Sequence, residues 1–174
     1  MRITVFGGSE PQPGDQAYLE AYRLGQLLGA AGHTVLTGGY SGTMEAVSRG
    51  AAEAGGRVIG VTCDQIEAWR PVGPNPWVQE EMRFNTLRER LFALIDQCDA
   101  ALVLPGGIGT LSEMAAMWSQ LQTGGIPRKK LILIGPEWER VMEVYFSSFA
   151  AYVGENHRAL LAFAPHVEAA CRML

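Results

Sequence analysis

Five short apolar runs, rich in β-branched residues, recur along the chain, and longer stretches with helical spacing lie between them. The runs are Ile3–Phe6, Thr34–Thr37, Val58–Thr62, Ala100–Leu104 and Leu131–Ile134. Because they are continuously apolar rather than alternating, they are typical of strands buried on both faces. The alternation predicts an α/β fold: a Rossmann-like, doubly wound parallel sheet of about five to seven strands with helices on both faces.

The helices are expected between these strands, and the whole chain, residues 1–174, is expected to form one domain. Helical spacing covers residues 15–31, 42–55, 80–97, 110–123 and 137–150, and a short sixth helix is expected near the end of the chain. The segment 64–79 (DQIEAWRPVGPNPWVQ) contains three prolines and is expected to be a loop.

Composition restricts the partners and the compartment. The formal net charge is −4 and the arginines are scattered, so nucleic acid is not expected as a partner. No run reaches the ~20 apolar residues of a membrane span, and the first apolar run is too short for a signal peptide. Cys63, Cys98 and Cys171 lie far apart without a nearby histidine. We therefore expect free thiols in a cytoplasmic protein, with no metal and no cofactor.

Glycine follows three of the predicted strands. The bends are Gly7-Gly8-Ser9, Thr37–Gly42 (TGGYSG) and Pro105–Gly109 (PGGIG). The carboxyl ends of parallel strands share one edge of the sheet, where ligands bind, and glycine lets backbone N–H groups approach a ligand. The third bend also precedes a helix, whose N-terminus favours a phosphate. A single bend of this kind is also compatible with a simple tight turn.

The expected phosphate- and nucleotide-binding residues are Gly8, Ser9, Gly39, Thr43, Gly106, Gly107, Gly109 and Thr110. A dinucleotide is not favoured, because the G-x-G-x-x-G fingerprint is absent and no acidic residue ends the second strand. A Walker loop is absent as well. A mononucleotide or a sugar phosphate fits better, although Ser9 and Thr43 could instead cap turns.

The string PGGIGTLSE, residues 105–113, follows Arg90 at a separation of fifteen residues. It resembles the P-G-G-x-G-T-x-x-E signature of the Lonely Guy family, the cytokinin riboside 5′-monophosphate phosphoribohydrolases, often labelled lysine decarboxylases. The likeness continues in VFGGS at the first strand and in TGGYSGTMEAVSRGAAEAGGRVIGV. The resemblance implies hydrolysis of the N-glycosidic bond of a nucleoside 5′-monophosphate, such as AMP or a cytokinin riboside monophosphate, to free base and ribose 5-phosphate. It implies Arg90 and Glu113 as the catalytic residues.

The chemistry of these two side chains agrees with that assignment. A carboxylate near C1′ stabilises the positive charge that builds on the sugar and activates water. Arginine suits phosphate or ribose oxygens and would keep Glu113 ionised. Other interpretations stay open: Thr110 and Glu113 match a capping box, and Arg90 could be a solvated helix charge paired with Glu89 or Glu81. Arg83 lies seven residues before Arg90 on the same predicted helix and could meet a phosphate.

The resemblance also implies a homodimer or a higher homo-oligomer, formed through helices beside the site. Met114, Met117 and Trp118 are apolar candidates for that contact or for the core. Trp69 and Trp77 could cover a base, or could simply pack.

The chain departs from the family pattern at two places. Leu87-Arg88-Glu89-Arg90-Leu91 stands where the family commonly has M-H-x-R-K, and Gly42-Thr43-Met44-Glu45 stands where it often has G-L-M-G. The first departure favours a second candidate function, a non-catalytic carrier of a phosphorylated nucleotide or pterin that is similar to molybdenum-cofactor carriers. Pyridoxal-dependent decarboxylation is disfavoured, because the only lysines, Lys129 and Lys130, enter the strand at the edge opposite the glycine bends.

Overall fold

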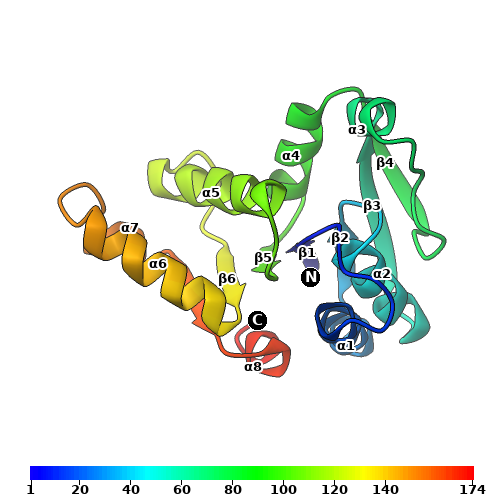
Figure 1. The fold of residues 1–174 in the computed structure, drawn as a ribbon, viewed down its shortest axis with the longest axis horizontal. Helices are drawn as coiled ribbons and strands as arrows, with labels where there is room; N and C mark the ends of the chain where they lie inside the picture. Colours follow the sequence, from blue (N-terminus) through cyan, green and yellow to red (C-terminus); the bar gives the residue numbers. More distant parts are fainter.

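The computed structural model describes residues 1–174 and contains one seven-stranded sheet in the order β4-β3-β2-β1-β5-β6-β7 (Figure 1). The strands are β1 (Arg2–Phe6), β2 (Thr34–Thr37), β3 (Arg57–Cys63), β4 (Glu80–Phe84), β5 (Ala100–Val103), β6 (Lys130–Ile134) and β7 (Leu161–Ala164). Every neighbouring pair is parallel. The strand order reverses between β1 and β5, which is where a doubly wound sheet opens a crevice for a ligand. The predicted α/β architecture is confirmed.

Helices cover both faces of this sheet (Figure 1). They are α1 (Gln16–Ala30), α2 (Thr43–Glu53), α3 (Asp64–Trp69), α4 (Leu87–Asp96), α5 (Ile108–Thr123), α6 (Pro136–Ser148), α7 (Glu155–Arg158) and α8 (Val167–Arg172). α1, α2 and α8 lie on one face, and α4, α5 and α6 lie on the other.

The strands supply a core to each helical layer because successive side chains of a strand point to opposite faces. Ile3 and Val5 of β1 belong to the core beneath α1 and α2. Phe6 belongs to the second core, beneath α4 and α5. All four residues of β5 are buried, as its continuous apolar sequence predicts.

The structure corrects three of the predicted elements. Residues 80–97 are not one helix: β4 occupies Glu80–Phe84, and α4 begins at Leu87 after a capping box made by Thr86 and Glu89. The expected loop at 64–79 begins with the short helix α3. A seventh strand, β7, lies in a region where no strand was expected.

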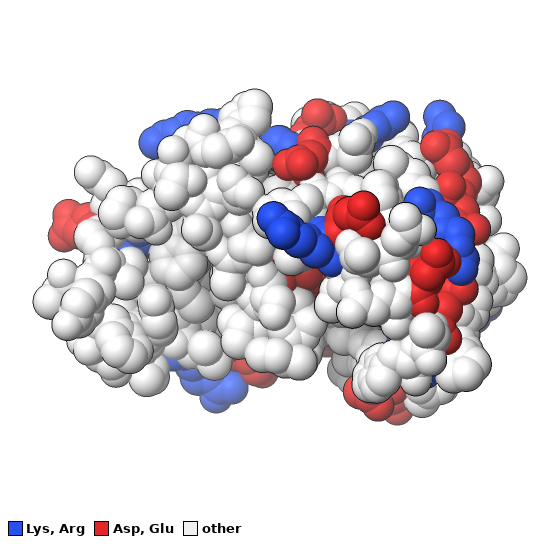
Figure 2. All heavy atoms as spheres, turned by 90° about the horizontal axis from the view of Figure 1, so that it is seen from above, with Lys and Arg blue, Asp and Glu red and all other residues white.

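Charged side chains are unevenly distributed over the face seen in Figure 2. They gather on the right of the view and are sparse on the left. None of the helices combines the length and the apolar character that crossing a membrane requires.

Candidate active site

The three glycine bends meet at the carboxyl edge of the sheet. The Gly8 carbonyl, after β1, accepts hydrogen bonds from the Thr43 backbone N–H at 2.9 Å and from the Thr43 hydroxyl at 3.0 Å. The Ser41 hydroxyl donates to the Ser9 carbonyl at 3.3 Å. The backbones of Gly106 and Gly8 are packed so closely that a Cβ added to Gly106 would lie 3.0 Å from the Gly8 nitrogen. The third bend is therefore in contact with the first. The sequence-predicted bends therefore form one surface.

The start of α5 leaves backbone donors free at this surface. The helix has Gly107 as its N-cap and no side-chain capping bond. The first N–H groups of a helix have no partner within it, and they carry the positive end of its dipole. Gly106, Gly107 and Gly109 are exposed, whereas Thr110 is buried. These exposed N–H groups can receive an anion such as a phosphate.

Two of the expected binding residues are engaged inside the protein. The Gly39 N–H donates to the Thr37 hydroxyl, and the Gly39 carbonyl accepts from the Asn75 backbone and side chain at 2.7 and 3.0 Å. Gly39 has a φ of 79°, in the left-handed region that glycine adopts readily. Gly39 therefore shapes the bend and offers no free backbone group. The Thr43 side chain likewise ties the bends together through Gly8.

Arg90 is buried beside these bends, with 5% of its surface exposed. Its Nε donates to the Val61 carbonyl of β3 at 2.7 Å. Its Nη1 lies 3.5 Å from Oε1 of Glu113, and its Nη2 lies 4.0 Å from the Met44 sulfur. A buried cation requires partners, and Glu113 is the carboxylate partner of Arg90. α4 and α5 thus bring together the two residues that the sequence predicts as catalytic.

Gly38 makes this position of Arg90 possible. A Cβ on Gly38 would lie 1.9 Å from Nη2 of Arg90 and 2.5 Å from the Met44 sulfur. Both distances are far below van der Waals contact, so any larger residue would displace the guanidinium. The glycine pair of this bend has divided roles: Gly38 makes room for Arg90, and Gly39 turns the chain.

Glu113 has an unusual protonation equilibrium. Burial raises the pKa of its carboxyl from 4.5 to about 7, while the Arg90 guanidinium acts in the opposite direction. Burial dominates because the separation from Arg90 is long for a charge-assisted hydrogen bond. A largely buried carboxyl with a pKa near neutrality, paired with an arginine, is typical of a group that acts in acid–base or electrostatic catalysis.

The structure decides between the alternatives for these residues. Because α5 begins at Ile108 rather than at residue 110, Thr110 lies inside the first turn and does not cap the helix. The capping box that Thr110 and Glu113 could have formed is absent, and Glu113 faces Arg90 instead. Arg90 is buried and does not pair with Glu89.

Arg83, which the sequence predicted on the same helix as Arg90, lies elsewhere. It lies on β4 rather than on the helix of Arg90, so the two do not form a basic stripe. Arg83 makes ion pairs with Asp64, Glu67 and Glu81. These contacts leave it no free charge for a phosphate.

Sequence reasoning missed Gly38 and Tyr40. The Arg90 Cζ lies 5.7 Å from the centre of the Tyr40 ring, within the range of a cation–π contact. Both residues belong to the TGGYSG bend, but no pattern in the sequence shows which bend residue meets an arginine that is fifty positions away.

Other residues considered in the sequence lie elsewhere. Met114 and Met117 are buried in the core beneath α5. Trp69 is 80% exposed at the end of α3. No group of three or more histidine, cysteine or acidic side chains is arranged to hold a metal ion. Lys129 donates to the Ile95 and Asp96 carbonyls, at the amino end of β6 and away from the bends.

Comparison with known families gives one match that covers most of the chain. The model of the SLOG cluster4 family matches residues 1–135, which include all three bends, Arg90 and Glu113. The matched segment ends just after β6.

Two curated relatives carry names of related activities. A probable cytokinin riboside 5′-monophosphate phosphoribohydrolase of Oryza sativa subsp. japonica is 30% identical over 87% of this chain and 58% of its own length. A pyrimidine/purine nucleotide 5′-monophosphate nucleosidase of Escherichia coli K12 is 32% identical over 83% of this chain and 34% of its own length. The chain thus spans about half of the first of these proteins and about a third of the second. These matches confirm the resemblance found in the sequence.

Among solved structures, the molybdenum cofactor binding protein from Rippkaea orientalis shares the fold. The match covers 99% of this chain and 93% of that one, with a TM-score of 0.77 and 24% identity. At that identity the likeness concerns the fold alone.

Proposed function

The chain belongs to the SLOG cluster4 family, and we propose that it hydrolyses the N-glycosidic bond of a nucleoside 5′-monophosphate, such as AMP or a cytokinin riboside monophosphate. The products would be the free base and ribose 5-phosphate. The observation that carries the proposal is the buried pair of Arg90 and Glu113 beside exposed glycine N–H groups at the start of α5. Such a site combines an anion-binding surface with a carboxylate one helical turn away.

The bends would hold the phosphate of the substrate. The N–H groups of Gly106, Gly107 and Gly109 and the dipole of α5 supply positive potential without a lysine. Gly8 and Ser9 approach the same point from β1, and both are partly exposed. A nucleotide anchored by its phosphate at this point would place its ribose over Glu113 and Arg90.

Glu113 would stabilise the transition state of glycosidic cleavage. As the bond between C1′ and the base nitrogen breaks, its electron pair leaves with the base, and positive charge develops on the ribose. The Glu113 carboxylate opposes that charge and accepts a proton from the water that adds to C1′. The departing base takes up a proton from solvent, and Glu113 returns the proton that it accepted to solvent, so that the sum is the addition of one water across the bond. Arg90 would bind ribose or phosphate oxygens and favour the ionised form of Glu113.

The departure at residues 87–91 leaves the position of Arg90 intact. Glu89, which stands within the altered stretch, accepts hydrogen bonds from the Thr86 N–H at 3.0 Å and from the Thr86 hydroxyl at 2.8 Å. It therefore caps α4 and does not enter the site. Arg90 is held by the Val61 carbonyl and by Glu113, which lie outside this stretch. The residues that flank the arginine in the family pattern are therefore not needed to hold Arg90 in the site.

The test is to incubate the purified protein with a panel of purine and pyrimidine monophosphates and to measure the liberated base. We expect turnover of at least one monophosphate. Glu113→Ala should abolish release of the base while nucleotide binding, measured by calorimetry, remains. Glu53→Ala, which removes an exposed carboxylate on α2, serves as the matched control and should retain activity. Tight binding without turnover by the unaltered protein would contradict the proposal.

A carrier of a phosphorylated nucleotide or pterin is the second candidate. An open cleft of about 620 Å³ adjoins Pro105 and extends toward Gly135 and His166, which would leave room for a ligand larger than a nucleotide. The same nucleotide panel distinguishes the two functions, because a carrier would bind without releasing a base.

We also infer that the protein forms a homodimer through α6. Val141 and Val144 of this helix are 54% and 64% exposed, and Phe149 and Tyr152, which follow it, are 47% and 83% exposed. Burial of such side chains by a second copy is favourable. Sedimentation should show a dimer that Val144→Glu dissociates, and a monomeric parent protein would refute this contact. Residence in the cytoplasm stays a prediction, supported by three cysteines that form no disulfide.

A further inference from the structure

Tyr40 is anchored at both ends, although the proposed chemistry does not itself require a tyrosine. Its ring lies under the Arg90 guanidinium, and only 1% of the residue is exposed. A guanidinium over an aromatic face is held by electrostatic attraction and by packing together. The ring therefore limits where the Arg90 guanidinium can lie.

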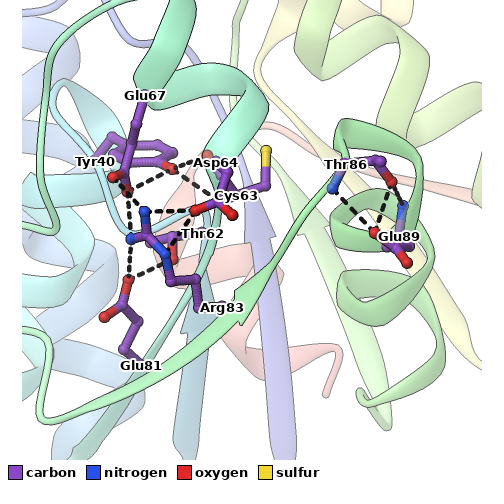
Figure 3. A network of polar contacts seen from close by, with 9 residues as sticks. All are labelled: Tyr40, Thr62, Cys63, Asp64, Glu67, Glu81, Arg83, Thr86 and Glu89. Atoms are coloured by element: carbon purple, nitrogen blue, oxygen red, sulfur yellow. Dashed lines mark hydrogen bonds and ion pairs between the residues drawn. The ribbon is translucent and has the colours of Figure 1, made fainter.

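The hydroxyl at the far end of Tyr40 fixes the ring in turn. It accepts a hydrogen bond from the Cys63 backbone N–H at 2.9 Å. Its own proton faces two acceptors, the Cys63 carbonyl at 3.2 Å and Oε1 of Glu67 at 3.3 Å (Figure 3). Burial raises the pKa of the hydroxyl, so it stays protonated and able to donate. The ring thus cannot tilt without breaking hydrogen bonds to β3 and α3.

Arg83 holds Glu67 in place. Its Nη1 and Nη2 lie 2.9 and 2.7 Å from the two carboxylate oxygens of Glu67, which is a bidentate pair. The same guanidinium donates to Asp64 at 2.8 Å and to Glu81 at 3.3 Å. Figure 3 shows these carboxylates converging on Arg83 from α3 and β4. The cluster therefore ties α3 to the sheet and keeps Glu67 against Tyr40.

We propose that Tyr40 is a positioning residue for Arg90, and that the Arg83–Glu67 pair is the support on which Tyr40 depends. The inference rests on the proposed function, because it assigns Tyr40 the task of setting the distance between Arg90 and Glu113. The other polar contacts of Arg90 are a hydrogen bond from Nε to the Val61 carbonyl and a long contact from Nη2 to the Met44 sulfur, and neither involves Nη1, the atom that faces Glu113.

The charged and titratable groups around this assembly are few. Glu113 of α5 faces Arg90 of α4, and Tyr40 lies on the opposite side of the guanidinium. Glu67 of α3 and Cys63 of β3 face the Tyr40 hydroxyl. If Arg90 moved away from Glu113, the negative charge of the carboxylate would lose part of its stabilisation and the pKa of Glu113 would rise. The pKa of Glu113 therefore reports the position of Arg90.

The experiment follows the Glu113 carboxyl by carbon NMR during a pH titration, with the signal assigned by its loss in Glu113→Gln. In Tyr40→Leu the midpoint should move upward by about one pH unit or more, and kcat/KM should fall at least about tenfold, mainly in kcat. Tyr40→Phe keeps the ring but loses the hydroxyl, and its shift should be smaller. Glu67→Gln should resemble Tyr40→Phe. Tyr22→Phe, which removes a hydroxyl bonded to Glu53 between α1 and α2, is the control and should change nothing.

The results separate this inference from the proposed function. An unchanged Glu113 midpoint in Tyr40→Leu, even with a lower melting temperature, would overturn the positioning role and make Tyr40 a packing residue only. A shifted midpoint in a protein that hydrolyses no monophosphate would support the positioning role and refute the enzyme. A folded Tyr40→Phe variant that equals Tyr40→Leu would also overturn the role of the ring.

Discussion

Replacing Glu113 by glutamine should stabilise the protein at alkaline pH while abolishing its activity. The carboxyl is buried, with 14% of the side chain exposed, and its pKa in the folded protein is raised from 4.5 to about 7. Folding therefore favours the neutral form. The stabilising contribution of this group is fully present below the unfolded pKa and is lost as the pH rises through the folded pKa. Glutamine is close to the neutral form in shape and cannot ionise, and its side-chain oxygen can still accept a hydrogen bond from the Arg90 guanidinium, so the buried cation keeps a partner.

The size of the effect follows from the two pKa values. A pKa difference of about 2.5 corresponds to roughly 3 kcal/mol of the free energy of unfolding. At about pH 8 the carboxyl is ionised in both the folded and the unfolded state, so Glu113→Gln should gain close to this amount. At about pH 5 it is largely neutral in the folded state and only partly ionised in the unfolded state, so the gain should be about 1 kcal/mol. Glu113→Gln should therefore raise the free energy of unfolding more at the higher pH than at the lower.

Urea unfolding at the two pH values measures this difference. Glu53→Gln is the matched control, because hydrogen bonds from Tyr22 and Arg49 lower the pKa of exposed Glu53 and so favour its charged form. That variant should not be stabilised at about pH 8. If Glu113→Gln gained no more stability at the higher pH than at the lower, the claim that Glu113 is held in an unfavourable charged state would be refuted.

Three further results are expected. Gly38→Ala should cost about 1–3 kcal/mol in urea unfolding and eliminate turnover, because its Cβ would occupy the space of Arg90. Gly73→Ala, whose Cβ would meet nothing within 4 Å, is the control and should change neither the stability nor the turnover. An active, stable Gly38→Ala would contradict the assigned packing. The value of kcat/KM should rise with pH through about 7 as Glu113 ionises, and a flat profile across that pH would count against a carboxylate role. Thr86→Ala should lower the free energy of unfolding by about 1 kcal/mol by removing the cap of α4, and an unchanged value would contradict the cap.

The sequence predicts the central strands well because strands that are buried on both faces consist mainly of apolar residues. Nearly all residues of β1, β2, β3, β5 and β6 are buried, and these five strands coincide with the five apolar runs of the sequence. β4 was missed because it lies at the edge of the sheet, where Glu80–Phe84 alternate between partly buried and exposed positions and include three charged residues. β7 lies at the other edge, where two of its four residues are only partly buried.

The site was predicted in outline but not in its contacts. The resemblance to a family pattern singled out Arg90 and Glu113, which the fold brings within 3.5 Å of each other. Whether Glu113 caps α5 or faces Arg90 depends on whether the helix begins at residue 110 or at Ile108. The sequence does not define the start of a helix to within two residues. The roles of Gly38 and Tyr40 depend on the Arg90 side chain of α4 reaching the bend after β2, which no local pattern encodes.

The product balance from a single monophosphate tests the central claim most directly. With AMP at about pH 8, where Glu113 is ionised, chromatography and phosphorus NMR should find adenine and ribose 5-phosphate in equal amounts, with no inorganic phosphate. Formation of adenosine and inorganic phosphate instead, or recovery of intact nucleotide across the whole panel, would contradict cleavage at C1′ by this carboxylate.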